Sequence, residues 1–456
     1  MRRLAVFSGG WSFEAAESVL GENEALDGLS GLVNKSLVNV DEQVGRSRYR
    51  FLETIRQYAM DKLLESGETS NAKDQHLKYF LEFAERGEEK LMGLEQGFWM
   101  TLFELEHDNF RGALRWALDN HPAVALKLAA PLAHFWMTHG YLSEGRSWCQ
   151  SALDRARGLP RDSGEIDQSR ARAFHVLALL SVNQGEHHAS LTAAQEAITL
   201  SRQIGDTLRL ARSLIVFGIA SAFSGEIAKA FESFRESENI SRQIGYKEEL
   251  AWVLASLSYI TFEVHGLEAE EKIRPYLEEA IKLSKASGSI YAHRSNEVLA
   301  RLAYARGDIV EAGRLSEDIL ANYRKTGDRL NYNGYRSATA HALLKMGNFE
   351  EALAIYRETI TAWQDLGHRG AIAHQLECFA FIARAQEQGE WAVKLLGAAE
   401  ALREVSKSTM TPKENMEYAH EIASLRAGMD EQNFASLWAH GHSMTMEQAI
   451  ELALHI

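Results

Sequence analysis

Apolar positions recur at helical spacing along most of the chain, and between residues 168 and 390 the whole pattern repeats about every 40 residues. Each unit holds two apolar helical stretches that glycines separate and close. One register returns almost verbatim, since the run from Leu200 to Asp206 is repeated from Ile240 to Tyr246. Two helices cannot bury their apolar faces alone, but stacked units can. The pattern therefore predicts an all-α, right-handed solenoid of the tetratricopeptide type.

Two series of glycines mark the units. The first series follows the first helix of each pair and consists of Gly185, Gly225, Gly266, Gly307 and Gly347. The second series closes each pair and consists of Gly205, Gly245, Gly288, Gly327 and Gly367. Small residues stand seven positions before or five positions after the first series, where helices are expected to cross: Ala178, Gly218, Ala300, Ala340, Ala230, Ala312 and Ala352. Tyr259 interrupts this pattern, and the next helix is expected from Pro275 to Ala286, so we expect irregular curvature there.

Residues 1–67 follow a different pattern. Helical spacing over 12–20, 24–34 and 53–64 is interrupted by alternating segments at 36–40 and 47–51, which a polar turn joins. Helices combined with a short β-hairpin predict a small winged-helix domain. We expect a helical connector over residues 68–121, repeats over 122–390, and capping helices over 391–456 that cover the open end of the solenoid.

Composition narrows the class of protein. The net charge of −14 disfavours non-specific binding to nucleic acid or anionic lipid. Two distant cysteines, Cys149 and Cys378, on apolar helical faces indicate core packing in a reducing compartment rather than a disulfide or a metal site. The apolar runs are shorter than a membrane span, so we expect no membrane association and a cytoplasmic location.

Several segments resemble a known family. These are the run from Leu32 to Val38, the run from Tyr49 to Ala59, the helical segment 104–118, and the C-terminal segments 395–403 and 444–450. They are similar to the winged-helix and repeat regions of the bacterial STAND-class signal-transduction ATPases. The resemblance implies a sensor and protein-interaction region of a signalling or transcriptional regulator. It also implies a protein or peptide partner, or a small-molecule inducer, bound by the repeats.

The chain departs from that family in one respect. No Gly-x-x-x-x-Gly-Lys-[Ser/Thr] motif occurs in the sequence, so the phosphate-binding loop of the family is absent. Ser8-Gly9-Gly10 has no following lysine and predicts only a turn before a helix. We therefore expect no ATP binding, and the resemblance places the ATPase module upstream, in cis or in trans. The sequence leaves open whether the chain is a fragment of a larger regulator or a complete protein.

Motifs for chemistry are weak. His187-His188 and His440-Gly-His442 lack a cysteine or carboxylate partner at ligand spacing, and the sequence holds no His-Glu-x-x-His or Gly-x-Ser-x-Gly motif. We therefore predict no catalytic residues, no metal site and no cofactor, and we interpret the chain as non-enzymatic.

A stand-alone winged-helix transcription factor with a regulatory repeat domain is the alternative. Its DNA contacts would come from Arg46, Arg48 and Arg50 in the hairpin. The presumed recognition helix, 24–34, carries Glu24 and Asp27 and no basic residue. DNA binding needs basic and amide side chains on that helix, so we expect no DNA binding by this chain alone.

The first helix of each repeat is expected to line the concave groove of the solenoid. Counting three, six, ten or thirteen residues back from the first glycine series selects one helical face. Its polar members are Arg172, Arg212, Glu263, Arg294, Glu297, Arg301, Tyr304 and His341. Arg301 and Tyr304 could receive a carboxylate or phosphate. In the alternative interpretation, Glu297 pairs with Arg294 and Arg301 as a solvated ladder on the helix surface.

Overall fold

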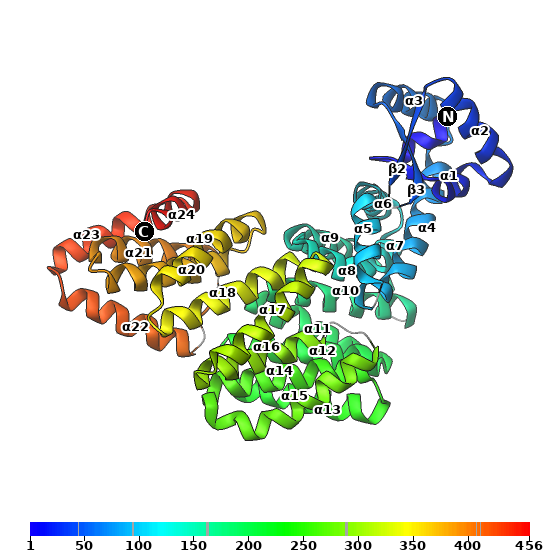
Figure 1. Ribbon diagram of the computed structural model, residues 1–456. Coiled ribbons are helices and arrows are strands. Elements are labelled where there is room, and N and C mark those ends of the chain that lie inside the picture. Colours follow the sequence, from blue (N-terminus) through cyan, green and yellow to red (C-terminus); the bar gives the residue numbers. More distant parts are fainter. Residues whose placement is uncertain (44, 94, 161–163, 288–290, 407, 411) are drawn as a thin grey trace. The chain divides into compact units, whose positions relative to one another are not determined.

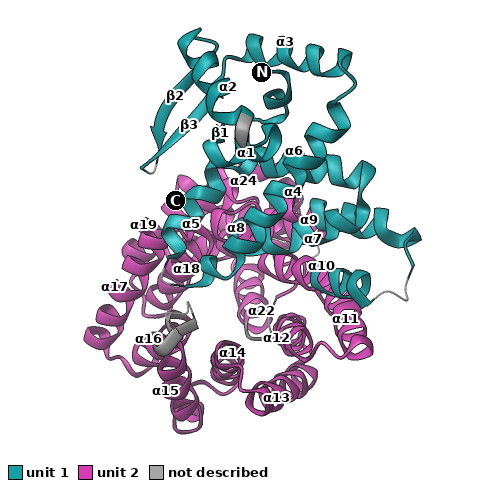
Figure 2. Cartoon of the chain, turned by 90° about the vertical axis from the view of Figure 1, so that its right-hand side faces the viewer, with its two compact units in different colours: residues 1–135, 147–173 teal, residues 136–146, 174–456 magenta. Residues whose placement is uncertain are grey.

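The computed structural model describes residues 1–43, 45–93, 95–160, 164–287, 291–406, 408–410 and 412–456 (Figure 1). The chain forms two compact units (Figure 2). Unit 1 comprises residues 1–135 and 147–173, and unit 2 comprises residues 136–146 and 174–456. Unit 1 includes the predicted winged helix and connector, and the predicted first helical pair, residues 122–157, contributes to both units.

Unit 1 contains the three described strands and the first helices. Its elements are η1 (Arg2–Val6), β1 (Trp11–Ser12), α1 (Phe13–Leu20), α2 (Glu22–Asn34), β2 (Val38–Gln43), β3 (Arg46–Phe51), α3 (Glu53–Glu65), α4 (Thr69–Glu88), η2 (Lys90–Met92), α5 (Gln96–Leu105), α6 (His107–Asn120), α7 (Pro122–Ala129) and η3 (Ala130–Leu132). Four further elements lie on both sides of the unit boundaries or next to them: α8 (Ala133–His139), α9 (Leu142–Arg155), η4 (Ala156–Gly158) and α10 (Gly164–Asn183).

The amino-terminal elements largely follow the sequence pattern. Ser12 caps α1, because its hydroxyl accepts a hydrogen bond from the backbone of Ala15. The hairpin is antiparallel, with Val38 opposite Phe51, and β2 begins and ends slightly later than expected. The two-residue strand β1, which the sequence pattern missed, pairs with β3 and gives the sheet order β1-β3-β2. Trp11 in β1 is buried and packs against Phe51.

A buried polar network holds the hairpin to the start of α6. Arg48 donates to both carboxylate oxygens of Glu106, at 2.6 and 3.4 Å, and to the carbonyls of Leu105 and Gly10. Asn109 donates to Glu106 and to the Gly10 carbonyl. A Cβ atom at Gly10 would lie 2.8 Å from the Tyr49 carbonyl. The glycines after Ser8 therefore form a tight structural turn against the sheet.

Unit 2 is a stack of helical pairs closed by additional helices. Its elements are α11 (His187–Ile204), α12 (Thr207–Phe223), α13 (Ile227–Ile244), α14 (Lys247–His265), η5 (Gly266–Ala269), α15 (Glu270–Ser287), α16 (Tyr291–Arg306), α17 (Ile309–Thr326), α18 (Arg329–Lys345), α19 (Phe349–Asp365), α20 (Arg369–Ala385), α21 (Gly389–Ser406), α22 (Pro412–Ala427), α23 (Glu431–His442) and α24 (Met446–Leu454). Consecutive helices pack as hairpins along the sequence, as expected for a tetratricopeptide-like solenoid (Figure 1).

The turns between pairs use a glycine followed by a capping residue. Gly327 ends α17 in the left-handed conformation, with φ of 69°, where residues with a side chain are strained. Asp328 then caps α18 by accepting a hydrogen bond from the backbone of Asn331. The same Gly-Asp pair closes α11 at Gly205 and Asp206. Gly288, which belongs to this series in the sequence, lies outside the described residues.

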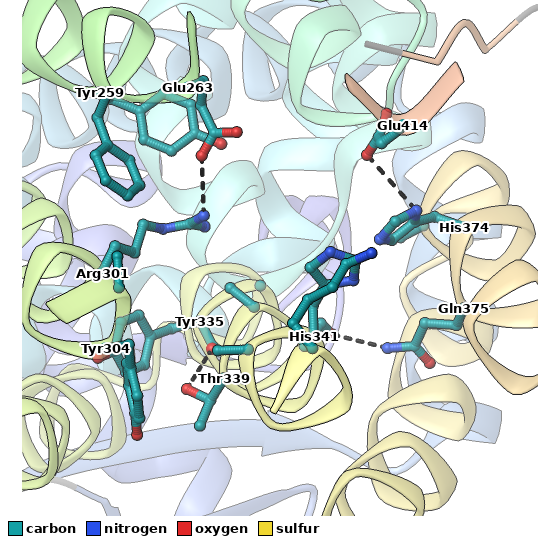
Figure 3. A pocket seen from close by; sticks show the side chains of 18 of the residues that line it. Tyr259, Glu263, Arg301, Tyr304, Tyr335, Thr339, His341, His374, Gln375 and Glu414 are labelled. Carbon is teal, nitrogen blue, oxygen red and sulfur yellow. Dashed lines mark hydrogen bonds and ion pairs between the residues drawn. The ribbon is translucent and has the colours of Figure 1, made fainter. Parts of the chain in front are cut away.

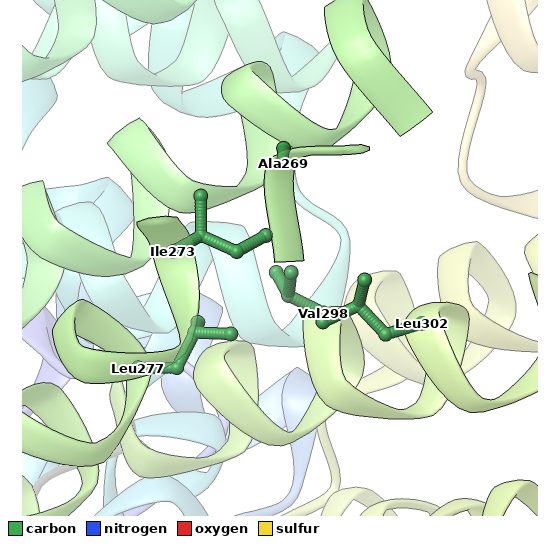
Figure 4. Close-up of a cluster of buried hydrophobic side chains, with 5 residues drawn as sticks. All are labelled: Ala269, Ile273, Leu277, Val298 and Leu302. Carbon is green, nitrogen blue, oxygen red and sulfur yellow. The ribbon is translucent and has the colours of Figure 1, made fainter. Parts of the chain in front are cut away.

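The cores between helices are apolar and close-packed. Figure 4 shows one cluster, in which residues of η5 and α15 meet residues of α16. Its buried members are Ala269, Ile273, Leu277, Val298 and Leu302. The helix expected to start at Pro275 begins earlier, at Glu270, because η5 leads directly into α15 and Pro275 lies inside the helix.

The carboxyl-terminal part of unit 2 touches its beginning. The Thr409 hydroxyl donates to the carbonyl of Phe223, 3.1 Å away and 186 residues distant in sequence. A methyl group at Gly185 would lie 3.4 Å from the imidazole of His368. Repeats far apart in the sequence are therefore in direct contact within this unit.

One described stretch, residues 247–285, is apolar and long enough to cross a membrane by length and composition alone. It comprises α14 and α15, and 61% of its most apolar window is buried inside the protein, as in a core helix.

We expect Gly218→Ala to destabilise the protein, although alanine favours helix. A Cβ atom there would lie 2.6 Å from the buried ring of Phe234, so the core must shift, at a cost of about 1–3 kcal/mol. Gly313→Ala is the matched control, because nothing lies within 4 Å of that position on α17, and it should stabilise the helix by about 0.5–1 kcal/mol. Urea denaturation of both variants measures the two changes, and equal effects would contradict the packing argument.

Candidate functional site

Two adjoining cavities lie in unit 2, with volumes of about 520 and 310 Å³. Figure 3 shows side chains that line the larger one. Helices α12, α14, α16, α18 and α20, each the first of a pair, line both cavities together with α19. The end of α10 completes the smaller cavity, and α22 completes the larger one. The two cavities share the lining residues Phe223, Tyr259, Arg301, Gly334, Tyr335 and Trp363. A cavity of this size, with aromatic walls and a few polar groups, has the dimensions of a small-molecule or short-peptide site.

The irregular repeat forms one wall. Tyr259 occupies the position where the neighbouring repeats carry Gly218 and Ala300, and its ring extends into both cavities. The rings of Tyr259 and Phe262 also pack against the buried cluster that Figure 4 shows. Burial raises the pKa of Tyr259, so its hydroxyl remains protonated and can donate a hydrogen bond.

Arg301 on α16 is the central cation of this wall. Its guanidinium lies 5.1 Å from the centre of the Tyr259 ring and 3.3 Å from the Glu263 carboxylate, which belongs to the previous repeat (Figure 3). These two contacts hold the head group in place. Its buried Nε atom has no hydrogen-bond acceptor within the described part of the chain. The guanidinium is therefore positioned by the protein with one donor left unused.

The opposite wall offers an acceptor. Gln375 on α20 donates its amide to the hydroxyls of Ser337 and Thr359, each at 2.7 Å. Its carbonyl oxygen is buried and accepts no hydrogen bond from any described residue. Tyr335 on α18 shares a 2.8 Å hydrogen bond with Ser316, and burial raises the pKa of Tyr335 to about 12.

The smaller cavity has its own charged edge on α16. Glu297 accepts a hydrogen bond from the hydroxyl of Tyr323, and burial raises the pKa of Glu297 although Arg294 nearby opposes this. Among the described residues, the ion pair of Arg301 is with Glu263 of the previous repeat and not with Glu297 of its own helix. Helix α16 therefore does not carry the exposed row of ion pairs between Glu297 and its two neighbouring arginines that the alternative interpretation expects.

Six of the eight residues that the repeat spacing selects line these cavities: Glu263, Arg294, Glu297, Arg301, Tyr304 and His341. The other two do not. Arg172 lies in unit 1, where it donates to both oxygens of Glu88. Arg212 lies in unit 2 and pairs with Glu249 at 2.6 Å.

The hairpin arginines of the alternative DNA-binding interpretation have different environments. Arg48 is buried in the network with Glu106, so the prediction that it could reach a phosphate is wrong. Arg50 is exposed and pairs with Asp41 at 3.2 Å, and Arg46 lies over the ring of Phe98. Of the three hairpin arginines, only Arg46 and Arg50 therefore lie on the surface.

Sequence reasoning missed His374, Gln375, Glu414 and Glu417, all of which line the larger cavity. For His374, the reason is that the turn after α20 has no glycine. Glu387 occupies that place with a positive φ of 63°. Counting thirteen residues back from Glu387 selects His374, as the same count from the earlier glycines selects Arg294. A turn position without glycine was thus the signal that the pattern search overlooked. Gln375 stands at none of the counted offsets, and Glu414 and Glu417 lie on α22, beyond the repeats that the spacing covers.

Comparison with known proteins gives relatives and a fold. No protein-family model matches the chain. The chain is 32% identical over 339 residues to "Putative HTH-type transcriptional regulator Rv0890c" of Mycobacterium tuberculosis and to its counterpart in Mycobacterium bovis. The match covers 72% of this chain and 37% of each relative, so the chain spans little more than a third of their length.

Solved structures of similar fold are helical-repeat proteins. A Rap protein complexed with competence and sporulation factor superposes with a TM-score of 0.53 at 12% identity, covering 82% of this chain and 93% of that one. The Rap conjugation gene regulator of plasmid pLS20, in complex with the Phr* peptide, gives 0.51 at 14% identity, covering 74% and 96%. Aspartyl phosphate phosphatase F from Bacillus subtilis gives 0.50 at 10% identity, covering 76% and 82%. These likenesses establish the all-α helical-repeat fold.

Proposed function

We propose that this chain is the non-catalytic sensor region of a bacterial transcriptional regulator, and that its ligand binds in the paired cavities of unit 2. The observation that carries the proposal is the larger cavity, about 520 Å³, in which Arg301 is held by Tyr259 and Glu263 with a donor still unused. The mycobacterial relatives, named as HTH-type transcriptional regulators, support the regulatory role.

The charges of the larger cavity indicate the kind of ligand. Arg301 and Lys345 face three carboxylates, those of Glu263, Glu414 and Glu417. The sequence alone suggested a carboxylate or phosphate group at Arg301 and Tyr304, and the three carboxylates disfavour a ligand that carries only negative charge. A ligand that carries both a cationic and an anionic group, with aromatic or aliphatic surface between them, matches the walls better. A short peptide has this chemistry, and one of the solved proteins of the same fold has a peptide bound.

The rest of the regulator is also part of this proposal. We assign the amino-terminal helices and hairpin to a winged helix that packs inside the regulator, since Arg48 is used internally and the chain is acidic overall. Ligand binding in the repeats would bias the contacts of that segment with an upstream STAND-type ATPase module in the cytoplasm, which is a coupling between two sites.

We expect Arg301→Ala to weaken ligand binding by about 2 kcal/mol or more, roughly 30-fold in Kd, because a positioned, partly buried charge of the cavity wall is lost. Tyr304→Ala, which removes an aromatic wall of the same cavity, should also weaken binding. The measurement is a thermal-shift screen of short peptides with the purified chain, followed by isothermal titration calorimetry of the hits with parent and variants.

Arg314→Ala is the matched control. Arg314 lies on the next helix, α17, is exposed, and pairs only with the exposed Glu311 and Asp318 among the described contacts. It should bind every hit as the parent does. Hits that bind the Arg301 and Tyr304 variants with unchanged affinity would show that the ligand occupies another surface and that this cavity is not the sensor site.

A further inference from the structure

Three side chains with metal-binding atoms converge beneath the larger cavity. They are His341 on α18, and His374 and Cys378 one turn apart on α20. One donor atom from each lies within 4.8 Å of the donors of the other two. Both imidazoles line the cavity, whereas Cys378 is fully buried behind them.

The distances match those of a tetrahedral metal site. The Cys378 sulfur is 3.7 Å from Nε2 of His374 and 3.8 Å from Nδ1 of His341. Zinc bonds of about 2.3 Å to sulfur and 2.0–2.1 Å to nitrogen, at a tetrahedral angle, separate the two ligand atoms by about 3.6 Å. The two sulfur-to-nitrogen distances therefore suit a metal ion, and the two ring nitrogens, which lie within 4.8 Å of each other, would have to approach to about 3.3 Å.

The outer nitrogens of both rings face carboxylates. Nδ1 of His374 lies 3.5 Å from Glu414 (Figure 3). It also lies 3.6 Å from Glu377, and Nε2 of His341 lies 3.7 Å from Glu417. A carboxylate that accepts a hydrogen bond from the outer nitrogen orients a ligating imidazole toward zinc and increases its basicity. Here the carboxylates stand at ion-pair distance, and Nδ1 of His374 is buried without a hydrogen-bond partner among the described residues, so a small movement of Glu414 would supply this contact. A cysteine and two histidines with carboxylates at this distance thus form more than a chance cluster of polar groups.

We propose that His341, His374 and Cys378 bind one zinc-type divalent cation in the wall of the cavity. Thiolate and imidazole ligands favour zinc over magnesium or calcium, which prefer oxygen. Three protein ligands leave the fourth coordination position of the metal free, as in zinc sites that exchange a ligand. Because the two imidazoles line the cavity, this fourth position is open to the cavity. The proposal replaces the sequence-based prediction of no metal site, and it goes beyond the proposed function because it requires no organic ligand.

The repeat explains why sequence spacing concealed the site. Cys378 and His374 are four residues apart, whereas His341 lies 37 residues before the cysteine, nearly one repeat away. Stacking of consecutive repeats brings equivalent helical faces together, so ligands one repeat apart can meet. No short motif records such a pair.

Cobalt(II) is the probe for the test, because thiolate-to-cobalt charge transfer reports the sulfur ligand and intense visible bands report tetrahedral geometry. The reduced full chain should bind one equivalent of cobalt with both signals, and zinc should displace it. Cys378→Ser should lose the charge-transfer band. His374→Ala and His341→Ala should weaken binding at least tenfold, and Glu414→Gln about 10-fold or more.

Controls come from the same chain. Cys149 is the second free cysteine, fully buried in unit 1, and Cys149→Ser should keep the charge-transfer band. His188→Ala removes an exposed histidine of unit 2 and should bind as the parent does. Circular dichroism verifies that each variant folds. If Cys378→Ser does not fold, His341→Ala is the deciding variant, because His341 is partly exposed. A parent protein without a thiolate band, or a band that survives both Cys378→Ser and His341→Ala, would overturn the proposal.

Discussion

Arg48→Met should lower the free energy of unfolding of unit 1 by about 3–5 kcal/mol, because it leaves the carboxylate of Glu106 buried without its cation. The backbone carbonyl of Leu105 loses its 2.6 Å bond from Arg48 in the same change, whereas the Gly10 carbonyl keeps its donor Asn109. Each buried acceptor left unsatisfied adds to the loss. The effect should appear as a lower urea midpoint and as faster amide hydrogen exchange in β3 and at the start of α6.

Arg50→Met is the control two residues away on the same strand. Arg50 and Asp41 are both about half exposed, and a pair of this kind contributes about 0–1 kcal/mol. Combining Arg48→Met with Glu106→Gln should recover part of the stability, because the buried, unpaired charge of Glu106 is removed. Equal urea midpoints for the Arg48 and Arg50 variants would mean that the buried network does not hold the hairpin.

Arg403→Met should have a similarly large effect in unit 2. Arg403 on α21 donates to both oxygens of Glu377 on α20, at 2.6 and 2.9 Å, and Glu377 is only 2% exposed. Removing the arginine leaves the carboxylate of Glu377 buried without a cation, which should lower the free energy of unfolding by about 3–5 kcal/mol. Arg329→Met, which removes an exposed pair with Asp365, should cost less than about 1 kcal/mol and serves as the control.

The loss in the Arg403 variant should depend on pH. Burial opposes ionisation of Glu377, but the hydrogen bonds from Arg403 outweigh it and lower the pKa of the carboxyl group. In the parent this pair stabilises the fold above the unfolded pKa of about 4.3, and the contribution is lost as pH falls. Without Arg403, burial, which raises the pKa of Glu377, is opposed by the contact with His374 and no longer by the arginine. The pKa of Glu377 should therefore rise, and the variant should regain stability as pH falls. The difference between parent and variant should therefore shrink from pH 7 toward pH 5, and a constant difference would contradict this assignment.

The repeat fold could be predicted from the sequence because its signals are local. A glycine with positive φ and the aspartate that follows it end one helix and begin the next, as Gly327 and Asp328 do, and both are visible without tertiary contacts. The same regularity selected the face of α16 that lines the cavities, with Arg301 and Tyr304. Local spacing is sufficient wherever one repeat resembles the next.

Features that depend on non-local contacts could not be predicted. The sequence of β3 looks like that of a solvent-exposed strand, in which Arg48 is one of several alternating polar residues. Only the contact with Glu106, 58 residues later in the chain, shows that Arg48 is buried. Strand β1 has two residues, too few for a period. His374 and Cys378 gain their possible chemistry from His341 on another helix. In each case, the deciding partner is distant in the sequence.

The contact between Thr409 and Phe223 has a kinetic consequence. In an open array of repeats, folding can start in any pair and spread to its neighbours. Here the cavity walls include Phe223 on α12 and Glu417 on α22, so almost 200 residues must be in place before the site is closed. Loops of that length are slow to close, and we expect the cavity to close last as the chain is synthesised. A ribosome that stalls before α22 would thus carry a stack of folded helices without a closed cavity.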